Sequence, residues 1–123
     1  MPYQLREEAR FFRVVFSDKI TPHDLVSLAH ELTVIEQARP VAPNRLIDLS
    51  QIDGRHLDYT DILAFVGQRQ QRRLANRVKA ALLAPSDVQR IFAQMFQRLT
   101  SHPQIAIEIF ATADAAEAWL AEP

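Results

Sequence analysis

The chain has 123 residues, the size of one ordinary domain, and its 48% hydrophobic content is enough for a core without disulfides or metals. It contains no cysteine and its net charge is −1, which excludes thiolate chemistry and gives no general attraction to nucleic acid. No apolar run approaches the ~20 residues of a membrane span, and the N-terminus lacks a signal-peptide core, so we expect a cytoplasmic protein.

The first third of the chain predicts two strands followed by a helix. Residues 3–20 hold a run of β-branched and aromatic side chains, which favour strands. Thr21 and Asp24 form a variant capping box around a proline, so a helix should begin there and end before Pro40. The apolar residues expected on its buried face are Leu25, Leu28, Leu32 and Ile35.

A short apolar strand is predicted at residues 45–49, followed by a polar loop that holds one of the two glycines, Gly54. In open α/β sheets, ligands usually bind beyond the carboxyl ends of the strands, so this loop is where we first expect a site. A helix should follow over residues 60–75. The later part of this helix, residues 68–73, is almost wholly polar and is expected to be exposed.

The last third predicts a strand at 78–84, a strongly amphipathic helix opened by a capping box at Ser86, a strand at 105–110 and a helix at 113–121. Strands that alternate with helices indicate βαβ units and a mostly parallel sheet. The fold class predicted for residues 1–123 is therefore α/β: one domain, order ββαβαβαβα, with about five strands and about four helices packed on both faces.

Three stretches of the chain, in this order, read NRLIDLSQIDG, QRRLANRVKAALLAPS and IAIEIFATADAAEAWL. Together they resemble the SpoIIAA-like (STAS/Sec14-type) domain proteins of bacteria, over nearly the whole chain. The resemblance implies a STAS-type sandwich with no established enzymatic activity, and its Sec14 side implies an apolar ligand cavity. In similar anti-sigma-factor antagonists, a strand ending in Asp-Leu-Ser leads to an Asp-Ser-Ser-Gly turn with a phosphorylated serine.

Asp48-Leu49-Ser50 matches the first part of that pattern, but the second part reads Asp58-Tyr59-Thr60-Asp61 and has no serine. Tyr59 or Thr60 would have to accept the phosphate instead. The residues that we predict to form a partner-binding or ligand-binding loop are Asp48, Ser50, Asp53, His56, Asp58, Tyr59 and Thr60.

The residues of this loop suggest two kinds of chemistry, metal binding and nucleophilic catalysis. Its acids and the imidazole of His56 could hold Mg²⁺, but the spacing matches no dedicated metal loop, and capping and turn roles are favoured. Ser50 with His56 suggests a nucleophile and a base, but no G-x-S-x-G elbow or glycine-rich oxyanion loop accompanies them. We therefore expect no catalytic residue, no metal and no cofactor.

A local basic cluster spans residues 69–79 of an otherwise neutral chain. Arg69, Arg72 and Arg73 are candidates for binding an anion, because guanidinium forks suit phosphate and carboxylate. The alternative is a solvated helix end, which the macrodipole also favours. Nucleic acid is not expected, because no aromatic residues interleave with the basic ones.

The leading functional hypothesis is a non-catalytic regulatory or protein-interaction module that acts through residues 53–61 and the helix after them. Small α/β domains often form twofold dimers, so a homodimer is expected. The alternative is a protein that binds a small apolar ligand in a pocket of ~300–1,000 Å³ between the sheet and a helix.

Overall fold

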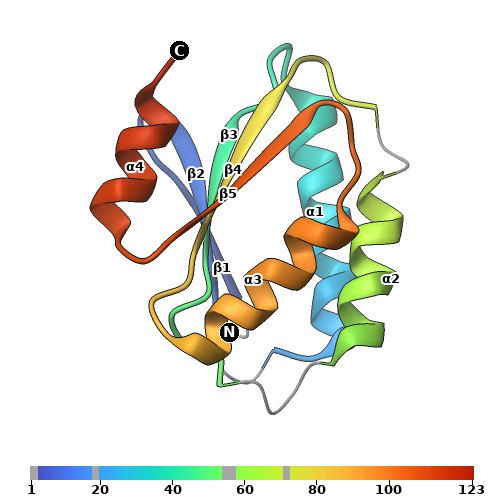
Figure 1. Cartoon of the computed structure of the whole chain (residues 1–123). Coiled ribbons are helices and arrows are strands. Elements are labelled where there is room, and N and C mark those ends of the chain that lie inside the picture. Colours follow the sequence, from blue (N-terminus) through green and yellow to red (C-terminus); the bar gives the residue numbers. More distant parts are fainter. Residues whose placement is uncertain (1–2, 18–19, 54–57, 71–72) are drawn as a thin grey trace.

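The computed structural model describes residues 3–17, 20–53, 58–70 and 73–123 (Figure 1). Within these residues it confirms the predicted α/β class, the order ββαβαβαβα, and a five-stranded, mostly parallel sheet with four helices. The elements are β1 Tyr3–Glu7, β2 Phe11–Phe16, α1 Pro22–Ala38, β3 Asn44–Asp48, α2 Tyr59–Gln70, β4 Val78–Leu83, α3 Asp87–Leu99, β5 Ile105–Phe110 and α4 Ala113–Ala121.

The strands lie in the order β1-β2-β3-β4-β5, with β1 antiparallel to β2 and every later pair parallel. Because crossovers are right-handed and the parallel strands advance in one direction, α1, α2 and α3 cover the same face. Helix α4 covers the other face (Figure 1). The order of the parallel strands never reverses, so the sheet lacks the topological switch point at which such folds usually bind ligands.

The three helices on the shared face begin at caps that the sequence predicts. The Thr21 side chain accepts a hydrogen bond from the backbone N–H of Asp24, and the Asp24 carboxylate accepts one in return from the Thr21 backbone. The same reciprocal pattern opens α3 at Ser86. At the start of α2, the Asp61 N–H donates to Asp58 Oδ1 (3.1 Å), and the Asp58 N–H donates to Asp61 Oδ2 (3.0 Å).

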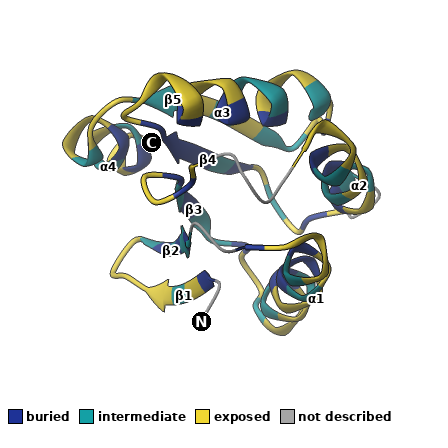
Figure 2. Ribbon diagram, turned by 90° about the horizontal axis from the view of Figure 1, so that it is seen from below, coloured by how far each residue is buried: buried dark blue, intermediate teal, exposed yellow. Residues whose placement is uncertain are grey.

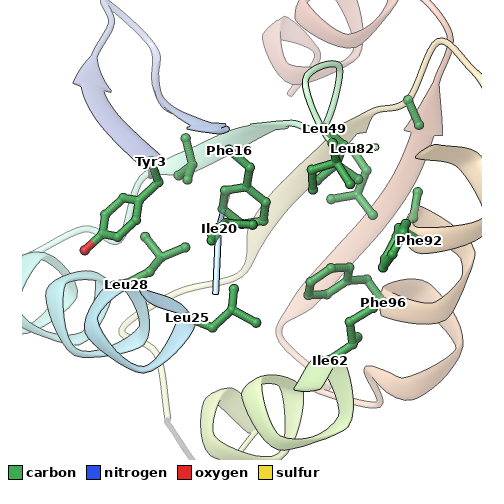
Figure 3. Close-up of a cluster of buried hydrophobic side chains, with 14 of the residues drawn as sticks. Tyr3, Phe16, Ile20, Leu25, Leu28, Leu49, Ile62, Leu82, Phe92 and Phe96 are labelled. Carbon is green, nitrogen blue, oxygen red and sulfur yellow. The ribbon is translucent and has the colours of Figure 1, made fainter. Parts of the chain in front are cut away.

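The main hydrophobic core fills the space between the sheet and α1 to α3, and it contains Phe16, Leu28, Leu82 and Phe96 (Figure 3). These helices turn their buried sides towards the sheet (Figure 2). A smaller cluster lies under α4, and its buried members are Leu46, Ala81, Leu83, Ala116 and Leu120. The sheet therefore separates two apolar layers, and strands β2 to β5 contribute residues to both of them.

The structure corrects one part of the expectation for α2. This helix ends at Gln70, and its polar later half is not wholly exposed, because only 8% of Arg69 is accessible to solvent. Arg69 follows Ile62 and Val66 on the buried side of the helix, at helical spacing. There it pairs with the buried carboxylate of Glu36.

Candidate functional site

A cavity of about 90 Å³, partly open to solvent, lies between the sheet and helices α1 to α3. Its floor is formed by strand residues that alternate towards the helices, and its roof by the inner sides of the three helices. Ile47 of the central strand β3 is only half-buried beneath these helices, because it borders the cavity. The lining includes Phe16, Leu28, Leu32, Arg45, Ile47, Phe65, Val66, Arg69, Ala80, Leu82, Phe96, Ile105 and Ile107.

The polar part of the cavity lining lies towards the amino ends of the parallel strands, whereas the apolar part extends to Phe16 at the end of β2. Arg45 is the second residue of β3 and Ile105 is the first residue of β5, while Gln70 ends α2. The loop that follows β3 leaves the sheet at the opposite end. The cavity and the predicted loop are therefore two separate places in the fold.

The size of the cavity limits what it can hold. A single water molecule needs ~10–15 Å³ of such space, so a cavity of about 90 Å³ admits several heavy atoms. It is smaller than the ~300–1,000 Å³ that we predicted from the sequence for a ligand pocket. It fits a small apolar molecule, or one apolar end of a larger one.

A buried ion cluster, formed by Glu36, Arg45 and Arg69, adjoins this cavity. Oε2 of Glu36 accepts hydrogen bonds from Arg45 Nη1 at 2.8 Å and from Arg69 Nη2 at 2.6 Å. The accessible fractions of the three residues are 7%, 4% and 8%, in the order Glu36, Arg45, Arg69. The three side chains come from α1, β3 and α2, so the cluster ties two helices to the central strand.

Further contacts hold the two guanidiniums. Arg45 Nη2 donates to the carbonyl oxygen of Pro43 (2.9 Å), and the Arg45 guanidinium lies 5.1 Å from the centroid of the Phe12 ring. Arg69 Nη1 donates to Thr33 Oγ1 at 3.4 Å. Arg45 is thus held by α1, by β2 and by the segment before β3, whereas both partners of Arg69 lie on α1.

The charges of the ion cluster do not balance. Two guanidiniums share one carboxylate, so the formal sum is +1. Burial raises the pKa of the Glu36 carboxyl, but the hydrogen bonds and charges of Arg69 and Arg45 outweigh burial and hold that pKa below its usual range. Burial lowers the pKa of Arg45, against the opposing pull of Glu36.

Two polar atoms of the ion cluster have no hydrogen-bond partner among the described residues, Glu36 Oε1 and Arg45 Nε. Buried polar groups are nearly always hydrogen-bonded, so such atoms are informative. Arg45 and Arg69 line the cavity, whereas no carboxylate does so among the described residues. The wall of the cavity at this point is therefore positive.

Hydrogen bonds between backbone and side chain fix the segment beside the cavity that leads into β5. The Gln70 side chain accepts from the backbone N–H and the hydroxyl of Ser101. Gln104 bonds to both backbone polar atoms of Leu74, and its own N–H donates to Nδ1 of His102 at 3.0 Å. His102 and Gln70 both border the cavity, so its polar rim is held in one arrangement.

Residues 48–52, the first part of the predicted loop, are held by hydrogen bonds among themselves and to α3. The Ser50 N–H and hydroxyl both donate to Asp48 Oδ1, at 2.9 and 2.5 Å. Nε2 of the buried Gln89 donates to the carbonyl oxygens of Ser50 (2.7 Å) and Ile52 (3.2 Å). These contacts build a fixed turn at the carboxyl end of β3.

The other described residues of the predicted loop, Asp53, Asp58, Tyr59 and Thr60, do not line the cavity. Asp53 is exposed, Asp58 caps α2, and Tyr59 and Thr60 are exposed in the first turn of that helix. His56 lies outside the described residues. Among the residues described, no three His, Cys, Asp or Glu side chains gather where they could hold one metal ion.

The predicted basic cluster does not form a single surface. Arg69 is buried in the ion cluster, whereas Arg73 is exposed, and Arg72 lies outside the described residues. Lys79 Nζ donates to the backbone oxygens of Trp119 and Glu122 at the end of α4. Of the three anion-binding candidates, the described structure therefore brings only Arg69 to the cavity.

Sequence reasoning missed Glu36 and Arg45, although a signal for both was present. Glu36 follows Leu32 by four residues on the buried side of α1. Arg45 precedes Ile47 by two, at a strand position that faces the helices. Charged residues that continue a buried apolar pattern are the signal that could have revealed the ion cluster.

The chain matches no model of a known protein family, and it matches no curated protein. Within the part of the chain that the structure describes, no helix has both the length and the apolar character needed to cross a membrane. Support for a function therefore comes from the cavity, from the ion cluster beside it and from the exposed turn at the other end of the sheet.

Proposed function

We propose that this chain is a non-catalytic binding module that takes a small apolar ligand into the cavity between the sheet and helices α1 to α3. The observation that carries the proposal is the cavity itself, which leaves apolar side chains of the central strands in contact with open space. Protein interiors are normally packed as densely as organic crystals, so an opening in the main core is unusual.

The energetic cost of the cavity supports this proposal. Apolar side chains that border an opening lose van der Waals contacts with neighbouring atoms, which destabilises the fold. A ligand that fills the cavity restores the lost contacts and offsets that cost.

The Sec14 side of the resemblance supports the same proposal, because it implies an apolar cavity. We therefore propose a SpoIIAA-like (STAS/Sec14-type) relationship and, since the chain has no cysteine, a cytoplasmic location.

The test uses hexanamide, a small neutral molecule with an apolar chain, titrated into methyl-labelled protein and followed by NMR. We expect saturable shifts of the methyl resonances of Ile47 and Ile107, which border the cavity. Ala80→Leu places a larger side chain in the cavity floor and should abolish these shifts. Ala106→Leu adds the same side chain at an exposed position of the neighbouring strand and should leave them unchanged.

Two results would contradict this function. The first is the absence of saturable shifts in the unmodified protein at millimolar hexanamide. The second is an Ala80→Leu protein that is folded and binds hexanamide as tightly as the Ala106→Leu protein does.

A second candidate function is protein contact at the start of α2, and a specific observation favours it. Tyr59 and Leu63 are 52% and 46% exposed and lie four residues apart on one helix. Exposed large apolar side chains that lie together are typical of interaction sites. The partner that we propose is a second copy of the chain, since twofold dimers are the commonest assemblies.

Sedimentation equilibrium tests this second candidate. The protein should dimerise at micromolar concentration, and Tyr59→Ser combined with Leu63→Ser should shift it to monomer. Val41→Ser removes an apolar side chain that is 65% exposed elsewhere and should not affect the dimer. A strict monomer at 100 µM, an order-of-magnitude ceiling for a specific dimer of this kind, would exclude the dimer.

A further inference from the structure

We infer that the ligand of the cavity carries a single carboxylate group, bound by the guanidiniums of Arg45 and Arg69. This inference rests on the proposed function, because it concerns the same cavity and names the chemical class of its ligand. The molecule that fits is a small amphiphile with one carboxylate and an apolar body.

The charge of the ion cluster is the first argument. Arg45 and Arg69 are almost inaccessible to solvent, and the only carboxylate that pairs with them in the described structure is that of Glu36. A buried charge without compensation is costly, so an excess of +1 beside an apolar cavity needs a reason. One additional anionic group in the cavity brings the formal sum to zero.

The donors that remain on the guanidiniums are the second argument. A guanidinium has five N–H donors, and Arg45 Nε has no hydrogen-bond partner among the described residues. The side chain of Arg45 is held from the other side by Glu36 and by the carbonyl oxygen of Pro43. These contacts hold the guanidinium and leave its Nε–H without a partner among the described residues.

The placement of the charges is the third argument. Arg45 and Arg69 line the cavity, whereas Glu36 is not part of the lining. The remainder of the lining is largely apolar and includes Ile47, Leu82 and Ile107. A carboxylate at the two guanidiniums would leave the body of the molecule against these side chains, which is the arrangement an amphiphile requires.

The size of the excess charge distinguishes a carboxylate from a phosphate. A carboxylate carries one negative charge at neutral pH, which equals the excess of the ion cluster. A phosphate monoester carries about −1.5 to −2 and has three oxygens to satisfy, so it would leave negative charge unbalanced in the cavity. Both anions suit arginine forks, and therefore the experiment includes both.

The test compares four probes on the unmodified protein by NMR titration: hexanoate, hexanamide, pentylammonium and pentyl phosphate, each of which carries a five-carbon alkyl chain. Charge-assisted hydrogen bonds are worth more than neutral ones, so hexanoate should bind about ten-fold more tightly than hexanamide. Pentylammonium should bind more weakly than hexanamide, and pentyl phosphate more weakly than hexanoate.

The outcomes separate this inference from the proposed function. If hexanoate and hexanamide bind with equal affinity, the carboxylate inference fails and the apolar binding function stands. If none of the four probes binds, the proposed function itself fails. If pentyl phosphate binds more tightly than hexanoate, the assignment of a carboxylate is wrong.

One matched set of variants tests the role of the ion cluster. Arg69→Met leaves Glu36 paired with Arg45 in a balanced pair, so the preference for hexanoate over hexanamide should fall to about two-fold or less. Arg69→Lys keeps the charge and should retain most of the preference. Arg73→Met removes the same charge from an exposed position and should change nothing.

A ten-fold preference that survives in a folded Arg69→Met protein would overturn the inference. If Arg69→Met does not fold, the four-probe series on the unmodified protein and the Arg69→Lys variant still decide the question. The probes differ only in the head group, so their ranking does not depend on any substitution.

Discussion

Replacing Glu36 by glutamine should destabilise the protein by about 3 kcal/mol, because the substitution leaves two buried guanidiniums without a counter-charge. Oε2 of Glu36 lies 2.8 Å from Arg45 Nη1 and 2.6 Å from Arg69 Nη2. The accessible fractions of the Glu36, Arg45 and Arg69 side chains are 4%, 5% and 9%, so solvent screens these charges little.

The magnitude follows from that burial. Removing one partner of a buried ion pair typically costs ~3–5 kcal/mol, and the carbonyl oxygen of glutamine still accepts one hydrogen bond, which places the loss near the lower value. The free energy of unfolding of a small domain is about 5–15 kcal/mol, so the substitution removes a large share of the stability.

Urea unfolding followed by circular dichroism measures this loss. The midpoint should fall by about 1–3 M with an unchanged slope, given the usual dependence of ~1–3 kcal/mol per M for small proteins. Glu108→Gln is the matched control, because it removes the same charge at an exposed position of β5 and should cost less than about 0.5 kcal/mol. If the two variants unfold at the same urea concentration, the ion cluster does not hold the structure as described.

Three further predictions concern pH, the turn after β3 and a helix cap. The pKa of Glu36 is lower in the folded protein than in the unfolded chain. The stability that Glu36 contributes to the fold is therefore complete above its pKa in the unfolded chain, and it is lost as the pH falls through its pKa in the folded protein. Acid titration of stability should therefore be steeper in the unmodified protein than in Glu36→Gln, and identical slopes would refute this. Gln89→Ala removes the hydrogen bonds to the Ser50 and Ile52 carbonyl oxygens. It should speed hydrogen exchange of the Ile52 amide and lower the free energy of unfolding by about 1–3 kcal/mol. Unchanged exchange of that amide would contradict this role of Gln89. Ser86→Ala should cost about 1 kcal/mol in urea unfolding by removing the cap of α3, and a change within error would show that the cap is dispensable.

The elements of this fold could be read from the sequence where local chemistry decides them. Thr21 with Asp24 forms its capping box from neighbours in the chain, and the same is true at Ser86. The order of strands and helices followed from alternating apolar patterns, and it determined the parallel sheet. The end of α2 was predicted too far along the chain, because the polar residues after Gln70 are compatible with a helix as well as with a loop.

The pairing within the ion cluster could not be predicted from local patterns, because its members meet only in the folded chain. Glu36 and Arg69 are 33 residues apart, and each is charged where a buried position would normally be apolar. Periodicity places these side chains on buried faces, but their charge favours solvent, and only the pairing across α1, β3 and α2 allows their burial.

The location of the candidate site also could not be predicted from the sequence. The turn after β3 was expected to hold the site because ligands bind at the carboxyl ends of parallel strands, but that rule applies where the strand order reverses. Here the order advances from β2 to β5 without reversal. The cavity depends instead on how side chains from four strands and three helices fill the core, which no local pattern reports.

The most direct test of the binding function is the NMR titration of the unmodified, methyl-labelled protein with hexanoate and hexanamide. We predict saturable shifts at Ile47 and Ile107 with both probes, and tighter binding of hexanoate by about ten-fold. Shifts that do not saturate, or that spread over the surface and leave these two side chains unaffected, would contradict a ligand in the cavity.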